Sequence, residues 1–281
     1  MVKARPPLDG GTVLVTGASS GIGRELAVQL AARAKTLALV ARRTARLEEL
    51  RATLVAQHPQ LRVVVLGADL SDEAYVERVI GEVRRQAGPV DILVNYAGVG
   101  DQALFDQAGW QRTRQVLATN VVAVAQLTAA LVPPMVERGR GGVLNIGSGA
   151  GLTVMPASAA YCASKHFVDG FSEALRADLA GTGVAVTQVC PGPVDSEFDQ
   201  AAGTTGGMTG GPPQVLRITA AQCAREALAG FERGQALVFP GRAYRVMMAL
   251  LPLVPRAVQR RQAARPVEQI RRTTAAAAAS G

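Results

Sequence analysis

Three side chains with acid–base chemistry stand close together in the second half of the chain. Tyr161 and Lys165 are four residues apart, and Ser148 precedes Tyr161 by thirteen. On a helix, positions i and i+4 share a face, so the ammonium of Lys165 would lie beside the phenol. A free tyrosine titrates near pH ~10, and a neighbouring cation lowers that pKa toward the working pH. With a serine hydroxyl to hold a substrate oxygen, the trio predicts proton transfer at a carbonyl. A Tyr-x-x-x-Lys pair is also common on surface helices, so this interpretation depends on the rest of the chain.

Short runs rich in Val and Leu alternate with longer helix-like segments along the chain. Such runs are mostly apolar without a polar residue at every second position, which indicates strands buried on both faces of a parallel sheet. The predicted strands are residues 12–16, 37–40, 62–66, 91–94, 142–146, 184–189 and 236–239. The predicted crossover helices are residues 21–34, 43–57, 72–87, 111–138, 158–181 and 220–233. The pattern predicts a doubly wound α/β fold with a parallel seven-stranded sheet flanked by helices. Trp110, the only tryptophan, is expected to pack at the start of the helix 111–138.

We expect one dinucleotide-binding catalytic domain over residues 1–241 and a basic C-terminal extension over residues 242–281. Within the domain, residues 195–215 are rich in Gly and Pro and are predicted to form a mobile substrate loop after the sixth strand. The extension holds eight arginines and one acid, and so carries +7 of the net charge of +8. The domain itself is nearly neutral and lacks an aromatic-interleaved basic stripe, so no nucleic-acid partner is expected.

Composition favours a reducing, cytoplasmic setting. The three cysteines have neither disulfide-framework nor metal-site spacing, and no metal is expected. No segment reaches the ~20 apolar residues that a membrane span needs, and Pro6-Pro7 stands where a signal peptide would be apolar. The apolar start of the extension, followed by arginines, leaves peripheral contact with an anionic membrane as one alternative. The other is that the extension packs over the substrate loop or a neighbouring subunit.

A glycine-rich loop lies between the first strand and the first helix. Its residues with a predicted role in phosphate binding are Gly17, Ser19, Ser20, Gly21, Ile22 and Gly23. Backbone amides at a helix N-terminus attract phosphate oxygens, and glycines allow a pyrophosphate to approach closely. The spacing Gly-x-x-x-Gly-x-Gly differs from the best-known dinucleotide fingerprint, so its position after a strand is the stronger indication.

The second strand ends at Ala41-Arg42-Arg43. An NAD-binding fold usually has an acid here for the adenosine ribose, whereas arginine pairs with the 2′-phosphate of NADP. The two arginines therefore favour NADP(H), with NAD(H) as the alternative. Both arginines would also suit a solvated helix start.

Taken with the glycine loop, the motifs Asn95-Tyr96-Ala97-Gly98, Asn120, Ser148, Tyr161-x-x-x-Lys165 and Pro191-Gly192-Pro193-Val194 follow a known order. The chain resembles the classical short-chain dehydrogenases/reductases over residues 10–240. The resemblance implies a single Rossmann-type domain and a homodimer or homotetramer. Two departures stand out: Tyr96 replaces a frequent asparagine, and Ser196 replaces a frequent threonine.

The resemblance also implies roles for individual residues. Tyr161 would donate the proton in reduction and accept it in oxidation, while Lys165 would bond the nicotinamide ribose. Ser148 would polarise the carbonyl, and Asn120 would hold a water that links the lysine to solvent. The residues implied to contact the adenine, the cofactor floor and the nicotinamide are Asp69, Leu70, Asn95, Ala97, Gly98, Pro191, Gly192 and Val194.

The leading functional prediction is an NADPH-dependent oxidoreductase that reversibly reduces a small-molecule ketone, aldehyde or 3-oxoacyl group to an alcohol. One alternative is a dehydrogenase of a steroid or other hydrophobic alcohol, suggested by Met155, the Gly-rich loop and the apolar extension. The other is a non-catalytic NADP-sensing protein. The presence of Ser148, Tyr161 and Lys165 together argues against the sensor, which would not require all three.

Overall fold

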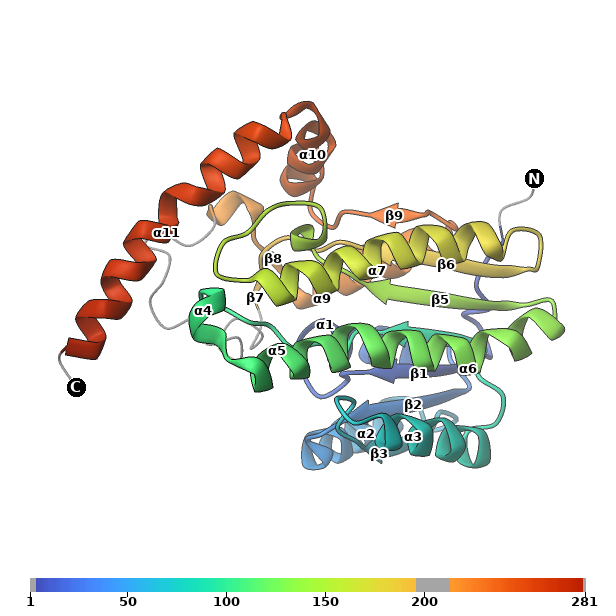
Figure 1. The fold of residues 1–281 in the computed structure, drawn as a ribbon. Helices are drawn as coiled ribbons and strands as arrows, with labels where there is room; N and C mark the ends of the chain where they lie inside the picture. The colour runs from blue at the N-terminus through green and yellow to red at the C-terminus, as the bar shows by residue number, and fades with distance from the viewer. Residues whose placement is uncertain (1–3, 196–212, 280–281) are drawn as a thin grey trace.

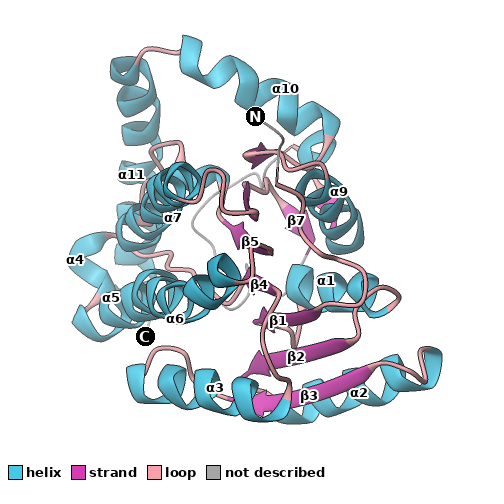
Figure 2. Cartoon of the chain, turned by 90° about the vertical axis from the view of Figure 1, so that its right-hand side faces the viewer, coloured by secondary structure: helices cyan, strands magenta, loops and turns pink. Residues whose placement is uncertain are grey.

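Seven parallel strands form the central sheet of the computed structural model, which describes residues 4–195 and 213–279. Their spatial order is β3-β2-β1-β4-β5-β6-β9, and Figure 2 shows the part from β3 to β5. The strands are β1 Thr12–Thr16, β2 Thr36–Ala41, β3 Arg62–Gly67, β4 Ile92–Asn95, β5 Gly141–Ile146, β6 Val184–Val189 and β9 Leu237–Val238. The doubly wound fold and all seven strands are as predicted, with ends that differ by at most one residue.

Helices cover both faces of this sheet (Figures 1 and 2). One layer holds α1 Gly21–Ala31, α2 Thr44–Gln57 and α9 Ala220–Glu232. The other holds α3 Glu73–Gln86, α5 Trp110–Leu117, α6 Ala123–Glu137 and α7 Ala159–Asp178. Successive strand side chains point to opposite faces. In β1, Val13 and Val15 accordingly pack in the apolar cluster under α1, while Leu14 packs in the cluster under α3 and α6.

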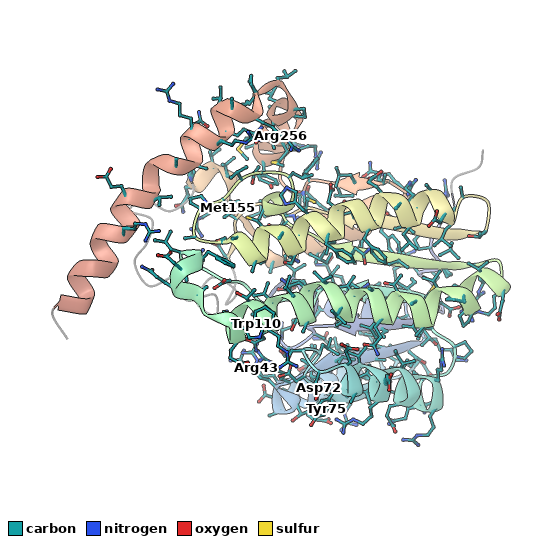
Figure 3. All side chains as sticks on the ribbon, in the orientation of Figure 1. Arg43, Asp72, Tyr75, Trp110, Met155 and Arg256 are labelled. Atoms are coloured by element: carbon teal, nitrogen blue, oxygen red, sulfur yellow. The ribbon has the colours of Figure 1, made fainter. Side chains whose placement is uncertain are left out.

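The predicted helix 111–138 contains an irregular turn. A π-helical segment, Ala118–Val122, separates α5 from α6 and contains Asn120. Such insertions in an α-helix are frequent at functional sites. Trp110, at the start of α5, is 68% exposed, so the expectation that it packs there is wrong. Trp110 and Tyr75, both labelled in Figure 3, line the same open hollow at the surface.

By length and composition, the continuous helix Trp110–Glu137 is apolar enough to cross a membrane. The prediction that no segment reaches this threshold is therefore wrong. Half of its most apolar window is buried, and the helix covers the sheet as a core helix does. Its hydropathy is thus accounted for by the fold.

Several elements outside the main sheet and its covering helices were not predicted. Near the substrate loop, β7 Val194–Asp195 pairs with β8 Ile218–Thr219 in a small separate sheet. The helix α4, Phe105–Ala108, precedes α5. The C-terminal extension forms α10 Arg242–Leu250 and the long α11 Arg256–Ala279, which runs past α4 in Figure 1. The guanidinium of Arg271 on α11 bonds Asp106 on α4 at 2.8 Å.

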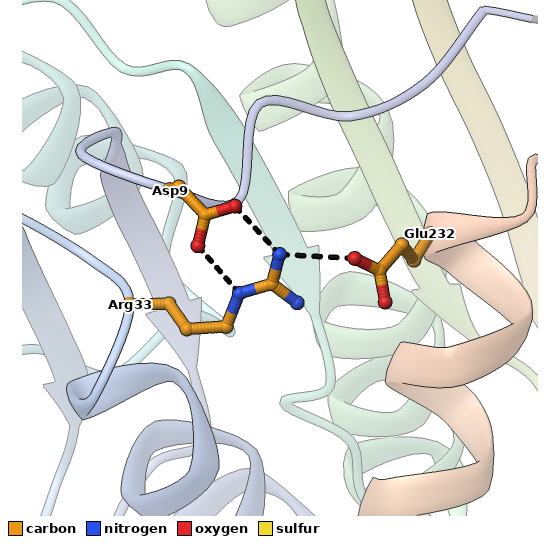
Figure 4. A network of polar contacts seen from close by, with 3 residues as sticks. All are labelled: Asp9, Arg33 and Glu232. Carbon is orange, nitrogen blue, oxygen red and sulfur yellow. Dashed lines mark hydrogen bonds and ion pairs between the residues drawn. The ribbon is translucent and has the colours of Figure 1, made fainter.

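A charged network joins the N-terminal segment to α1 and α9 (Figure 4). The guanidinium of Arg33 donates two hydrogen bonds of 2.7 Å to Asp9 and one of 3.0 Å to Glu232. These bonds hold the pKa of Asp9 below its usual range and raise that of Arg33. Arg33 thus clamps the ends of two helices that pack side by side.

Candidate active site

The loops that carry the candidate residues meet at one edge of the sheet. They follow β1, β4, β5 and β6, whose carboxyl ends lie side by side because all four strands are parallel. The chain reverses its winding between β1 and β4. Open α/β sheets bind ligands at such a switch point.

The glycine loop is shaped to accept a phosphate group. Gly17 has φ +72° and Gly21 has φ +56°, backbone conformations that favour glycine. A Cβ on Gly17 would lie 2.9 Å from both Ala97 Cα and Tyr96 Cδ1, so the loop after β4 approaches it closely. The free amides at the start of α1 face this loop, as anion binding at a helix N-terminus requires.

Thr16 fastens the glycine loop to the floor of the site. Its hydroxyl donates to Val94 O and accepts from the amides of Tyr96 and Ala97, each at 3.1 Å. Thr16 is almost fully buried. Sequence reasoning gave it no role, although a threonine at the end of a buried strand is a polar group that needs partners.

A cleft of about 600 Å³ connects the glycine loop to the ends of β2, β3 and β4. Its lining includes these predicted residues: Gly17, Ser19, Ser20, Gly21, Arg42, Arg43, Asp69, Leu70, Ala97 and Gly98. It also includes Arg46, Val99 and Thr119, which were not predicted. Arg46 lies three residues after Arg43, one helical turn into α2, and that spacing was the available signal. The glycine cradle and the cationic rim fit the pyrophosphate and adenosine half of a dinucleotide.

Three arginines therefore stand at the adenosine end of the cleft. Arg43 donates to Ser20 Oγ at 2.8 Å and to Ser19 Oγ at 3.3 Å, which brings its guanidinium over the glycine loop. Arg42 lies 3.9 Å from Asp69 and is more than half exposed. A second, more open hollow of about 1110 Å³ extends from Arg42 and Asp69 toward Trp110. It is larger but lies away from Tyr161 and Lys165.

Other predicted cofactor residues are placed behind the cleft. Asn95 is buried, and its amide donates to Asn145 Oδ1 at 2.9 Å, while Asn145 donates to Ser172 Oγ at 2.9 Å. This chain links β4, β5 and α7 beneath the site. Ile22 lies on the buried face of α1, and a Cβ on Gly23 would overlap the ring of Tyr96. These residues shape the cleft through packing.

Asn120 bonds groups on two sides. Its amide nitrogen donates to Val99 O and to Ser164 Oγ, each at 3.0 Å, and its oxygen accepts from the Val99 amide at 2.8 Å. Ser164 in turn donates to Tyr161 O at 2.7 Å. Asn120 therefore joins the loop after β4 to the helix of Tyr161. Ser164, inside the Tyr-x-x-x-Lys segment, was not predicted to contribute.

Lys165 is buried next to Tyr161, with an exposure of 6%. Its Nζ lies 5.8 Å from the centre of the Tyr161 ring and donates to Ile146 O at 2.9 Å. Burial lowers the pKa of Lys165 to about 8. A Cβ on Gly98 would lie 3.4 Å from Asn120 Oδ1 and 3.8 Å from Lys165 Nζ, so both groups face the same space over Gly98.

Ser148 begins the turn that follows β5. Its Oγ accepts from the Ala150 amide at 3.1 Å at the start of the 3-10 helix Gly149–Gly151. This helix packs on α7, because a Cβ on Gly151 would lie 2.5 Å from Lys165 O. The Gly149 amide donates to Pro191 O at 3.1 Å, which ties the Ser148 turn to the Pro191–Val194 segment.

Most of the substrate loop 195–215, and Ser196 with it, lies outside the described residues. Residues 1–3 and 280–281 lie outside them as well. In the described part, β7 and the 3-10 helix Gln214–Leu216 flank the loop. Among the residues described, no group of His, Cys, Asp and Glu side chains could hold a metal.

Comparison with known proteins agrees with this geometry. The sequence profile of the family described as short chain dehydrogenase matches residues 11–206. An uncharacterized oxidoreductase of Myxococcus xanthus is 42% identical over 187 residues, which cover 66% of this chain and 73% of that protein. The chain spans 62–65% of the length of several other curated relatives.

Two solved structures share the fold. A short-chain dehydrogenase from Sphingobium yanoikuyae, in complex with NADPH, has a TM-score of 0.77 at 31% identity and covers 86% of this chain and 92% of its own. One from Burkholderia phymatum, in complex with NAD, has a TM-score of 0.76 at 25% identity and covers 87% and 93%. With the glycine cradle and the Tyr161–Lys165 helix in place, the chain belongs to the classical short-chain dehydrogenases/reductases, oxidoreductases that use a nicotinamide dinucleotide.

Proposed function

We propose that this protein is an NADPH-dependent reductase that converts a ketone, aldehyde or 3-oxoacyl group to an alcohol, and runs in reverse when concentrations favour oxidation. The observation that carries the proposal is the buried ammonium of Lys165, held 5.8 Å from the ring of Tyr161 on the same face of α7. A charge buried this deeply costs free energy and is kept where chemistry uses it.

The roles of the residues follow from their positions. When bound, NADPH supplies the hydride that reduces the carbonyl carbon. Tyr161 donates its phenolic proton to the carbonyl oxygen as negative charge develops there. Lys165 stabilises the phenolate that remains, and Ser148 holds the oxygen in place. The bonds from Asn120 to Ser164 and Val99 keep these groups aligned.

Substitution of Tyr161 tests the catalytic part of this proposal. Tyr161→Phe keeps the ring and removes the proton, so turnover of a carbonyl panel should fall by about 100-fold or more, while NADPH binding stays within about twofold. Undiminished turnover in this variant would refute the mechanism. Tight NADPH binding by the unaltered protein with no turnover of any carbonyl would favour the NADP-sensing alternative.

The preference for NADPH over NADH is proposed from Arg42, Arg43 and Arg46 at the adenosine end of the cleft. The double variant Arg42→Gln/Arg43→Gln should weaken NADPH binding by about 10- to 100-fold and leave NADH binding nearly unchanged, because only NADPH carries the 2′-phosphate. Arg51→Gln is a matched control, since Arg51 is an exposed arginine of α2 paired with Glu48. Equal losses for both cofactors would contradict the proposal.

A hydrophobic alcohol or ketone is the second candidate substrate class. Val154 and Met155 follow the Ser148 turn and are 51% and 37% exposed. Met155 is labelled in Figure 3, below the junction of α10 and α11. Exposed apolar groups beside a site are suited to bind apolar substrate surface. Under this alternative, kcat/KM should rise with alkyl length across a ketone series, and Met155→Ser should flatten that rise.

We also propose peripheral contact with an anionic membrane through the outer face of α10 and the turn after it. Its apolar side chains are exposed: Val246 62%, Met247 42%, Leu250 55% and Leu253 77%. Arg256, Arg260 and Arg261 follow, and residues 242–267 contain no acid. Arginines near an anionic surface each contribute about 1 kcal/mol. A second copy docking on this face by two-fold symmetry would bring like charges together.

Vesicle co-sedimentation tests the membrane proposal with the full chain. The unaltered protein should pellet with vesicles containing phosphatidylserine, and Leu250→Ser/Leu253→Ser should stay in solution. Equal pelleting of both proteins would remove the proposal. A homodimer or homotetramer and a cytoplasmic location remain predictions, the first to be checked by light scattering on the purified protein and the second by fractionation of cells.

A further inference from the structure

The C-terminal helix α10 places a second tyrosine against the candidate active site. Tyr244 is 4% exposed, and its ring meets that of Phe239 edge-on with centroids 6.2 Å apart. The helix is held at its start by Glu226, which accepts from the Gly241 amide at 3.0 Å and from Arg245 at 2.9 Å. Tyr244 thus approaches the site from a segment outside the motifs described above.

Two glycines make room for this side chain. A Cβ on Gly192 would lie 2.6–2.8 Å from three atoms of the Tyr244 ring. A Cβ on Gly149 would overlap the Tyr244 hydroxyl oxygen, while the ring carbon Cζ would be 3.3 Å away. Gly149 directly follows Ser148, and Gly192 lies in the Pro191–Val194 segment. The phenol therefore touches both segments at once.

The two segments and Tyr244 share one acceptor. Pro191 O accepts from the Gly149 amide at 3.1 Å and from the Tyr244 hydroxyl at 3.4 Å. Burial is the main reason why the pKa of Tyr244 lies above its usual value, and the nearby Cys190 and Tyr161 add to the shift. Tyr244 consequently stays a neutral donor at working pH.

We propose that Tyr244 is a positioning residue for the reaction: it holds the Ser148 turn against the Pro191–Val194 segment, so that the serine hydroxyl and the nicotinamide wall stay aligned with Tyr161. This rests on the proposed function. Misplacement of a reacting group by about 1 Å can cost about 100-fold in rate. The C-terminal helix is then part of the catalytic unit.

A rescue experiment tests this contact. Gly149→Ala should lower kcat by about 10- to 100-fold, because its methyl group overlaps the Tyr244 hydroxyl. Tyr244→Phe removes only that oxygen and a long hydrogen bond, so its own loss should be about two- to fivefold. The double variant Gly149→Ala/Tyr244→Phe should recover to within about threefold of Tyr244→Phe alone. Because removal of the same overlap would also restore stability, kcat is compared only among variants that their melting temperatures show to be folded at the assay temperature.

Met248→Ala is the matched control. Met248 lies one turn further along the same buried face of α10 and is also 4% exposed. Met248→Ala should lower the melting temperature about as much as Tyr244→Ala does, because both substitutions leave a cavity. Met248→Ala should keep kcat within about twofold, whereas Tyr244→Ala should lower kcat by about 10-fold or more. Absence of rescue, or equal loss of kcat in Met248→Ala and Tyr244→Ala, would overturn the proposal.

The same set of proteins separates this proposal from the proposed function. The affinity for NADPH, measured by nicotinamide fluorescence, should fall in Gly149→Ala and recover in the double variant, because the Pro191–Val194 segment moves with the turn. If the unaltered protein reduces no carbonyl, the proposed function fails, and these binding constants still decide the role of Tyr244.

Discussion

Replacing Lys165 by methionine should make the protein more stable at neutral pH while it abolishes turnover. The ammonium is buried, and burial lowers the pKa of Lys165 from 10.5 to about 8. Each pKa unit corresponds to about 1.4 kcal/mol. Keeping the proton on Lys165 in the folded state at pH 7 therefore costs roughly 3 kcal/mol. Methionine has a similar length and carries no charge, so it removes this cost.

The direction of the pH dependence follows from proton counting. Between pH 8 and pH 10.5 the unfolded chain holds a proton on Lys165 that the folded chain lacks, so the stability of the unaltered protein rises with pH over this window. The stabilising contribution of the neutral Lys165 amine is complete above pH 10.5, the pKa in the unfolded chain. This contribution is lost as the pH falls through about 8, the pKa in the folded chain. The variant lacks this rise. It also loses the 2.9 Å bond to Ile146 O, which costs about 1 kcal/mol.

Lys165→Met should accordingly be more stable than the unaltered protein by roughly 2 kcal/mol at pH 7, or about 3 °C in melting temperature, and less stable by about 1 kcal/mol above pH 10.5. Urea unfolding of both proteins over this pH range, without cofactor, gives the difference, and titrations common to both proteins cancel. Lys35→Met, at an exposed lysine, should change the free energy of unfolding by an amount that is independent of pH. A Lys165→Met variant that is less stable at pH 7, or a difference independent of pH, would refute the reasoning.

Three further predictions concern the scaffold. Thr16→Val leaves the amides of Tyr96 and Ala97 without an acceptor and should cost about 2–3 kcal/mol, seen as a melting temperature lower by about 3–5 °C and as weaker NADPH binding. Thr16→Ser, which keeps the hydroxyl, should lose much less. Gly17→Ala combines φ +72° with overlap against Ala97 and should lose NADPH affinity by about 10-fold or more, whereas Gly81→Ala, in open space on α3, should be neutral or stabilising by up to about 1 kcal/mol. Arg33→Met removes the clamp in Figure 4 and should lower the melting temperature by less than about 3 °C, a loss that shrinks at high salt because the pairs are exposed. A Thr16→Ser variant as unstable as Thr16→Val, equal effects of the two glycine substitutions, or a salt-independent loss in Arg33→Met would each contradict the corresponding reasoning.

The sheet could be predicted from the sequence because its signal is local. Residues 12–16 are a continuous run of apolar or β-branched residues, and so are residues 184–189 apart from Gln188. The structure has strands with those same bounds. The residues that line the cleft were found for the same reason, since the glycine loop and Arg42-Arg43 directly follow strands. Arg46 and Thr119 were missed because they reach the cleft only once α2 and the π-helical segment have placed them.

Irregular elements were harder to predict. Nothing in the composition of residues 111–138 distinguishes the π-helical turn at Asn120 from regular helix, because the extra residue is accommodated by backbone hydrogen bonds. The strands β7 and β8 contain two residues each, and a strand of two residues is too short to show a periodic pattern. The exposure of Trp110 likewise depends on the course of α4 and α5.

The place of Tyr244 shows most clearly where sequence reasoning loses information. Its two partners, Gly149 and Gly192, are visible in the sequence, and a glycine in a loop is normally interpreted as a need for positive φ. Neither of them has positive φ. Each lacks a side chain because the ring or hydroxyl of Tyr244, from a segment far along the chain, fills the space where Cβ would stand. A sequence that ended at residue 241 would keep every motif of the family and leave that space empty, so the positioning role proposed for Tyr244 enters the interpretation of any variant of α10.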